Sequence, residues 1–216
     1  MKKIFFLIFI LFVIDLDSQD SIDCNSNLSI FAEYYKVKNY EAAYEPWMSV
    51  RKECPKINPA IYFQGSRMLE EFIKNSEGEL KLSYQNDLLN LYDEWLINFP
   101  AYNGRSIVGQ IMSNKAQKMF DYKLASKSEI YNLFENAYQT DPMSFDDPKP
   151  LYTYFKTYFE LYKEDNSEIT LSEIFNKYEE LDERYNSIID EYSKQIDIII
   201  NKENSGVALT SREKRN

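Results

Sequence analysis

The run AYEPWMSVRKECP at positions 43–55 decides the fold, because its pattern of residue classes occurs three times in the chain. LLNLYDEWLINFP occupies 88–100, and IYNLFENAYQTDP occupies 130–142. In each run, a small or aliphatic residue lies twelve positions before the closing proline, an aromatic residue eight before it and an apolar residue five before it. Such self-similarity is typical of stacked helical hairpins, since one hairpin alone cannot bury its apolar face.

The rest of the chain is also predicted to be helical. Gly and Pro are rare, with 5 and 7 among 216 residues, and no pair of alternating strands flanks an Asn-Gly turn. We therefore predict an all-α solenoid of stacked antiparallel hairpins over 24–205. The hairpins are expected at about 24–57, 58–102, 103–143 and 144–205. Gly65 and Gly109 occupy matching early positions in two first helices, which indicates close helix–helix approach there.

The last predicted helix is unusually long. Its apolar residues recur from Leu171 to Ile199, and neither Pro nor Gly interrupts the chain before Gly206. A helix of about 35 residues extends roughly 50 Å, beyond the length of its partner. The spacing mostly alternates between three and four, as in a coiled coil, so the distal half either packs back on the solenoid or binds another helix. The segment 206–216 is predicted to be a disordered tail.

The N-terminus has the features of an export signal. Lys2 and Lys3 precede eleven apolar residues, from Ile4 to Ile14. This run is too short to cross a bilayer, which needs about 20 helical residues. We predict a cleaved signal peptide over 1–19, and hence a chain exported to the periplasm or cell surface of a Gram-negative bacterium, with no integral membrane span after cleavage.

The chain has two cysteines, Cys24 and Cys54, placed at the start and the end of the first predicted hairpin. Antiparallel helices bring these two positions to the same end of the pair. In an exported protein we expect them to form a disulfide. The alternative is two independent thiols.

Composition argues against several kinds of function. The net charge of −10 repels nucleic-acid phosphates. The chain contains no histidine, which excludes His-based triads and His-ligated zinc, and its five glycines form no phosphate-binding loop. Ser49 and Lys52 match an S-x-x-K spacing, but the triplets that accompany this motif in penicillin-interacting enzymes are absent. We predict no enzyme activity, no metal site and no cofactor; a small carboxylate-dependent enzyme is the remaining catalytic alternative.

Three segments, NLSIF at 27–31, KNYEAAYEPW at 38–47 and VRKECP at 50–55, resemble the N-terminal region of exported tetratricopeptide-repeat (TPR) proteins of Bacteroidota. When Pro55 is aligned with the closing proline of that repeat, Tyr34, Ala43 and Trp47 fall on its aromatic, small and aromatic positions. The family repeat has about 34 residues. The prolines of this chain are 45 and 42 residues apart, so its later first helices must be longer.

The resemblance implies a scaffold that binds a partner segment along the concave surface formed by its first helices. Carried over to this chain, that partner-binding groove contains Ala32, Tyr35, Tyr62, Ser66, Ser106, Gln110, Ser113 and Asn114. We therefore expect a non-catalytic protein–protein interaction scaffold in the cell envelope, engaging a peptide segment or a helix. The alternative is a glycan-binding accessory protein on similar helices, which the 18 tyrosines favour.

Overall fold

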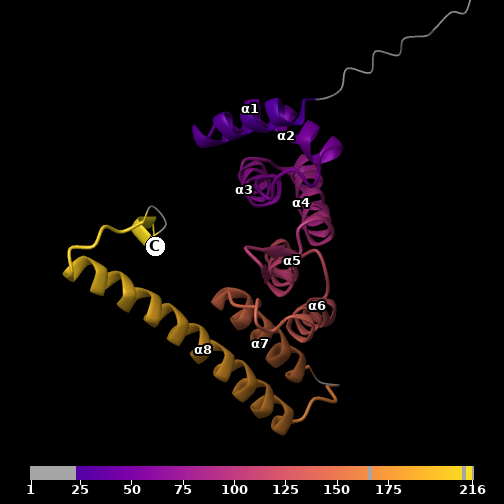
Figure 1. Ribbon diagram of the computed structural model, residues 1–216. Coiled ribbons are helices and arrows are strands. Elements are labelled where there is room, and N and C mark those ends of the chain that lie inside the picture. Colours follow the sequence, from indigo (N-terminus) through magenta and orange to yellow (C-terminus); the bar gives the residue numbers. More distant parts are fainter. Residues whose placement is uncertain (1–22, 165–166, 211–212, 216) are drawn as a thin grey trace, which may run out of the picture. The chain divides into compact units, whose positions relative to one another are not determined.

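The computed structural model describes residues 23–164, 167–210 and 213–215, and within them the chain is mostly helical (Figure 1). The all-α prediction is confirmed. The predicted signal peptide lies outside the described residues. The helices are α1 (Cys24–Lys36), α2 (Tyr40–Glu53), α3 (Ala60–Lys74), α4 (Gly78–Asn98), α5 (Val108–Tyr122), α6 (Lys127–Thr140), α7 (Pro148–Tyr162) and α8 (Leu171–Asn204).

The chain divides into two compact units. The first ends at Ile57 and the second begins at Asn58. The boundary follows Pro55, where the backbone leaves α2 and turns before α3 begins.

The first unit is the hairpin of α1 and α2. Asp23 and Asn39 cap the two helices, each accepting hydrogen bonds from backbone N–H groups of the first turn. Cys24 and Cys54 form a disulfide, with their Cα atoms 6.2 Å apart, so the start of α1 is joined to the residue that ends α2. The pairing expected from the sequence is thus present in the structure.

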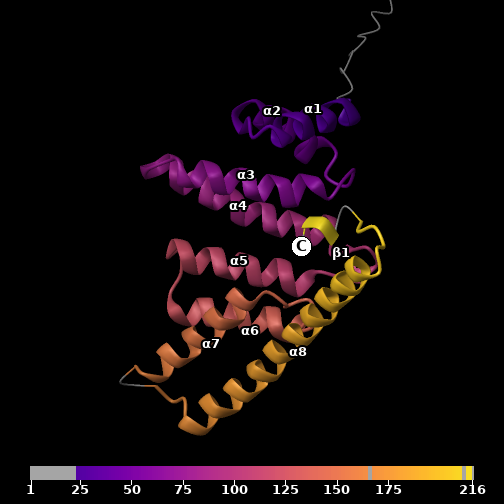
Figure 2. The same ribbon diagram turned by 90° about the vertical axis from the view of Figure 1, so that its left-hand side faces the viewer.

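In the second unit, helices pack in the order in which they occur in the sequence. α3 packs on α4, α4 on α5, α5 on α6, α6 on α7 and α7 on α8 (Figure 2). The core in the α5–α8 region consists of Ala116, Ile130, Phe134, Ala137, Tyr138, Phe145, Leu151, Tyr154, Leu181 and Ile188. The Phe134 ring is fully buried and lies about 6 Å from the rings of both Phe145 and Tyr154.

A small β-hairpin lies at the predicted break between α4 and α5, where no strands were expected. β1 (Ala101–Tyr102) pairs antiparallel with β2 (Arg105–Ser106). The two turn residues, Asn103 and Gly104, have φ values of 51° and 74°. Two positive φ angles are the requirement of a type I′ turn, which Asn-Gly satisfies with little strain. The hairpin brings Tyr102 to the edge of α4.

Gly109 of α5 lies directly against the end of α6. A Cβ atom at this position would stand 2.1 Å from the carbonyl oxygen of Asp141 and 3.0 Å from the backbone nitrogen of Phe145. The Gly109 N–H donates to the Ser144 hydroxyl at 2.8 Å. The close helix approach predicted at this glycine is therefore present.

A polar cluster fixes the first half of α8 to α6 and α7. Glu135 of α6 accepts hydrogen bonds from the hydroxyls of Tyr131, at 2.7 Å, and Tyr154. Lys177 of α8 lies 3.2 Å from the same carboxylate oxygen and 3.1 Å from the Tyr154 hydroxyl. Burial alone would raise the pKa of Glu135, but the hydrogen bonds and the Lys177 charge lower it to about 2.

Part of the segment 206–216, which was predicted to be a disordered tail, is described by the structure. Glu213–Arg215 form a short 3-10 helix. The Thr210 N–H donates to the Glu213 carboxylate at 2.8 Å, and Lys202 of α8 pairs with that carboxylate at 2.5 Å. These local contacts give a short polar segment a structure that its lack of apolar periodicity did not predict.

Candidate functional site

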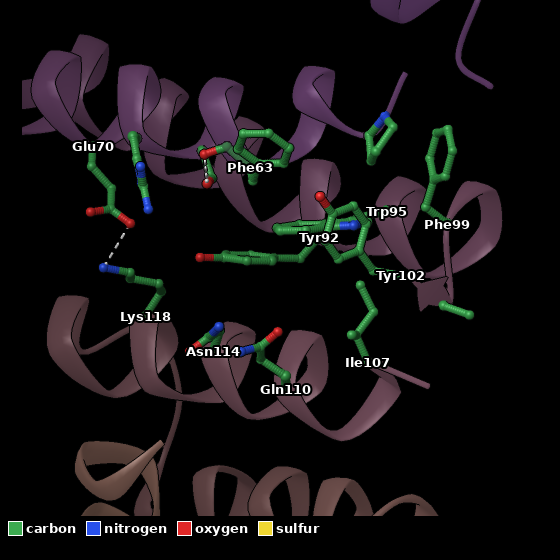
Figure 3. Close-up of a pocket in the computed structure, with 14 residues that line it drawn as sticks. Phe63, Glu70, Tyr92, Trp95, Phe99, Tyr102, Ile107, Gln110, Asn114 and Lys118 are labelled. Atoms are coloured by element: carbon green, nitrogen blue, oxygen red, sulfur yellow. Dashed lines mark hydrogen bonds and ion pairs between the residues drawn. The ribbon is translucent and has the colours of Figure 1, made fainter. Parts of the chain in front are cut away.

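A groove between α3, α4 and α5 of the second unit has a volume of about 430 Å³ (Figure 3). Binding sites for small ligands and side chains usually measure about 300–1,000 Å³. We call it the α3–α5 groove. It is lined by Pro59, Phe63, Ser66, Arg67, Glu70, Tyr92, Trp95, Phe99, Ala101, Tyr102, Ile107, Gln110, Asn114 and Lys118.

Helical periodicity explains why these residues share one groove. On α5, Gln110, Asn114 and Lys118 recur every four residues and therefore form one row. Phe63 and Glu70 belong to the facing row on α3. Figure 3 shows the two rows facing each other, with side chains of α4 between and behind them. From Ile107 to Lys118 the α5 row extends about 16 Å at 1.5 Å per residue.

The two ends of the groove differ in chemistry. Phe99, Tyr102 and Ile107 gather at one end, and Tyr102 is half exposed. At the other end, Lys118 of α5 and Glu70 of α3 form an ion pair of 2.9 Å across the groove (Figure 3). The groove therefore runs from an aromatic, apolar end to a charged end.

Several polar groups line the groove. They are the Tyr92 hydroxyl, the carboxamides of Gln110 and Asn114, and the indole N–H of Trp95. Burial raises the pKa of Tyr92, and the nearby Glu70 and Tyr122 raise it further, so its hydroxyl stays protonated and can donate. Among these groups, the Trp95 N–H is buried without a hydrogen-bond partner in the described residues, which is costly. Gln110 and Asn114 are partly exposed, so their carboxamides are accessible to a bound molecule.

The predicted partner-binding residues fall into three groups. Ser66, Gln110 and Asn114 line the α3–α5 groove as expected. Tyr62 and Ser113 do not, and their predicted surface position is corrected, because both are fully buried. The Tyr62 ring packs on those of Trp95 and Phe99, while the Ser113 hydroxyl donates to the Gln110 carbonyl.

The remaining three predicted residues lie elsewhere. Ser106 is exposed in β2, where its hydroxyl donates to the Asp141 carboxylate at 2.5 Å. Ala32 and Tyr35 belong to α1 of the first unit, where Ala32 is exposed and Tyr35 contacts the rings of Phe31 and Tyr40.

The sequence-based prediction missed the aromatic side of the groove. Tyr92, Trp95 and Phe99 belong to the second proline-terminated run, at 88–100, and the structure places all three in the lining of the cavity. Tyr102 reaches the groove only through the Asn-Gly hairpin, and that dipeptide is the signal that could have placed it there.

Within the described residues, no group of three His, Cys, Asp or Glu side chains has the arrangement to hold a metal ion. Among the described helices, none combines the length and apolar character that a membrane span requires. Comparison of the chain with protein families, with curated proteins and with solved structures gives no match.

Proposed function

We propose that this chain is a non-catalytic interaction module of the cell envelope, built from TPR-like hairpins, and that the α3–α5 groove binds an extended peptide segment of a partner protein. The groove length of about 16 Å matches about five residues of extended chain at 3.3 Å each. The predicted export signal and the resemblance of the first hairpin to TPR proteins are consistent with this proposal.

The observation that carries the proposal is the pair of partly exposed carboxamides of Gln110 and Asn114, which both line the groove. Each carboxamide offers both a donor and an acceptor, the combination that a peptide backbone requires. They lie four residues apart on α5 and thus face the same bound segment. The aromatic end, formed by residues such as Phe99 and Tyr102, suits a large apolar side chain of that segment.

A glycan is the second candidate, because the exposed ring of Tyr102 beside two carboxamides is also a sugar-binding combination. Stacking on a sugar requires a free aromatic face. Trp95 instead packs against Tyr62 and Tyr92, with ring centroids 6.1 and 6.3 Å away and planes inclined by 21° and 7°. The largest ring of the groove is thus engaged within the protein, which favours the peptide.

The proposal is tested by panning phage-displayed random peptides on the mature chain and, in parallel, probing an immobilised oligosaccharide array. A selected peptide is then titrated calorimetrically against Asn114→Ala and Tyr102→Ala. Removing a groove hydrogen bond or an aromatic contact should weaken binding about tenfold, which corresponds to about 1.4 kcal/mol.

Matched substitutions outside the groove serve as controls. Asn132 of α6 and Tyr152 of α7 are exposed and do not line the groove, so Asn132→Ala and Tyr152→Ala should leave the affinity unchanged. An equal loss of peptide affinity in the groove variants and the control variants would refute the proposed site. Binding to oligosaccharides with no enrichment of any peptide would establish the glycan alternative instead.

A further inference from the structure

A second surface, on α8, is separate from the α3–α5 groove. α8 buries only one narrow row of apolar residues, formed by Ile174, Leu181 and Ile188, against the rest of the unit. Beside this row lies a second apolar row, whose members are between 40% and 58% exposed. We call it the α8 stripe; it consists of Phe175, Tyr178, Tyr185, Ile189, Tyr192 and Ile196.

The stripe has the spacing of a coiled-coil interface. Tyr178, Tyr185 and Tyr192 are seven residues apart, as are Ile189 and Ile196. Successive members are three or four residues apart, except between Tyr178 and Tyr185, where Asp182 occupies the intervening position. A helix keeps such positions on one face when a second helix packs along it. Half-exposed tyrosines at the centre of a surface are also typical of residues that dominate binding energy.

Among the described helices, none lies along the second half of the stripe. In both Figure 1 and Figure 2, α8 begins beside α7, runs along it and extends past its far end. Along this half the apolar side chains of Tyr192 and Ile196 border a hollow of about 620 Å³, whose other side includes Arg105 and Asp146. The apolar row therefore continues past the point where the protein itself covers α8.

The open edge of the stripe is acidic. At 3.6 residues per turn, Glu179, Glu183, Asp190 and Asp197 form a row on the side of the stripe opposite the buried row. Asp182 occupies a position within the stripe itself. This arrangement attracts a helix that carries basic residues beside its own apolar row.

The basic residues of α8 neutralise little of this edge. Lys177 pairs with Glu135 and Glu180, Lys202 pairs with Glu213, and Arg184 donates to the backbone carbonyls of the α6–α7 loop. Lys194 is the basic residue left near the acidic row. The open edge is therefore predominantly negative.

We propose that the α8 stripe is a docking surface for a basic amphipathic helix of a partner protein. The acidic edge argues against a second copy of this chain as the occupant. An antiparallel pair of α8 helices would place acidic edge against acidic edge, and a parallel pair would place Asp182 opposite Asp182. The inference is independent of the proposed groove function, because the two surfaces share no residue.

The test uses two synthetic peptides of about four heptads with the same Leu and Ile core, one flanked by Lys and the other by Glu. The Lys peptide should bind the mature chain at least about tenfold more tightly than the Glu peptide, and the difference should shrink with added salt. Light scattering should find the chain monomeric without peptide. Equal binding of both peptides, or binding of neither, would overturn the proposal.

Variants locate the binding on α8. Ile189→Asp places a charge in the middle of the stripe and should weaken Lys-peptide binding at least about tenfold. Ile198→Asp makes the same change at an exposed position outside the stripe and should leave Lys-peptide binding unchanged. Circular dichroism verifies that both variants stay helical. Equal weakening of Lys-peptide binding by both variants would contradict the proposed partner, and so would a dimer of this chain that Ile189→Asp dissociates. The groove variant Asn114→Ala is a further control and should bind the Lys peptide normally.

Discussion

Replacing Gly109 by alanine sets two opposing effects against each other. Alanine normally stabilises a helix by up to about 1 kcal/mol relative to glycine. Here the new Cβ would stand 2.1 Å from the carbonyl oxygen of Asp141 and 3.0 Å from the amide nitrogen of Phe145. Both neighbouring atoms belong to the backbone, so neither moves away without shifting the end of α6.

The clash should outweigh the gain in helix propensity. Overpacking a well-packed site costs about 1–3 kcal/mol, and a contact with backbone belongs to the upper part of that range. Gly109 is the second residue of α5, where the propensity gain is smaller than in a helix interior. We expect a net destabilisation of about 2 kcal/mol, which lowers the melting temperature by roughly 4–8 °C for a chain of this size.

Urea unfolding followed by circular dichroism measures this difference. The control is Ser128→Ala, because Ser128 is also the second residue of its helix, α6, and is exposed. The free energy of unfolding of that variant should stay within about 0.5 kcal/mol of the value for the original chain. A Gly109→Ala chain as stable as the original, or more stable, would refute the close packing of α5 against the end of α6.

Three more predictions concern stability. Phe134→Ala removes a fully buried ring from the core and should cost about 3–5 kcal/mol in urea unfolding, whereas a cost below about 1 kcal/mol would contradict the packing. Replacing both Cys24 and Cys54 by Ser opens a loop with a sequence separation of 30 and should destabilise the first unit by about 3–4 kcal/mol, measured by thermal unfolding; an unchanged melting curve would refute this. Because the pKa of Glu135 falls from 4.5 to about 2 on folding, the stabilisation that its ionised form contributes is present above pH 4.5 and lost as the pH falls towards 2. The Glu135→Gln variant should therefore have a lower free energy of unfolding than the original chain at pH 6, and the two values should converge near pH 2. A difference in stability that does not depend on pH would be inconsistent with the Lys177 cluster.

Much of the helical pattern was readable from the sequence because it depends on local signals. The S-x-x-E and T-x-x-E patterns that begin at Ser126 and Thr170 are such signals, since both form capping boxes with reciprocal hydrogen bonds at the starts of α6 and α8. The proline-terminated runs correspond to the ends of α2, α4 and α6. Such features are set by residues a few positions apart and do not require knowledge of the tertiary packing.

The site was less predictable because it depends on which face of each helix meets its neighbours. Tyr62 and Ser113 were expected on the surface and are buried, while Tyr92 and Trp95 were not expected in the groove and line it. An apolar stripe identifies the inner face of a helix, but a ring at its edge can either fill the core or border a cavity. Only the arrangement of α3, α4 and α5 decides between the two.

The two tryptophans allow the most direct test of the groove. Trp95 lines it, whereas Trp47 is fully buried in α2 of the first unit. A chain labelled with 5-fluorotryptophan should give two ¹⁹F resonances, assigned with Trp95→Phe. Saturation with a peptide selected from the phage library should shift the Trp95 resonance and leave that of Trp47 in place. Binding of the peptide without any shift at Trp95 would contradict the proposed groove function.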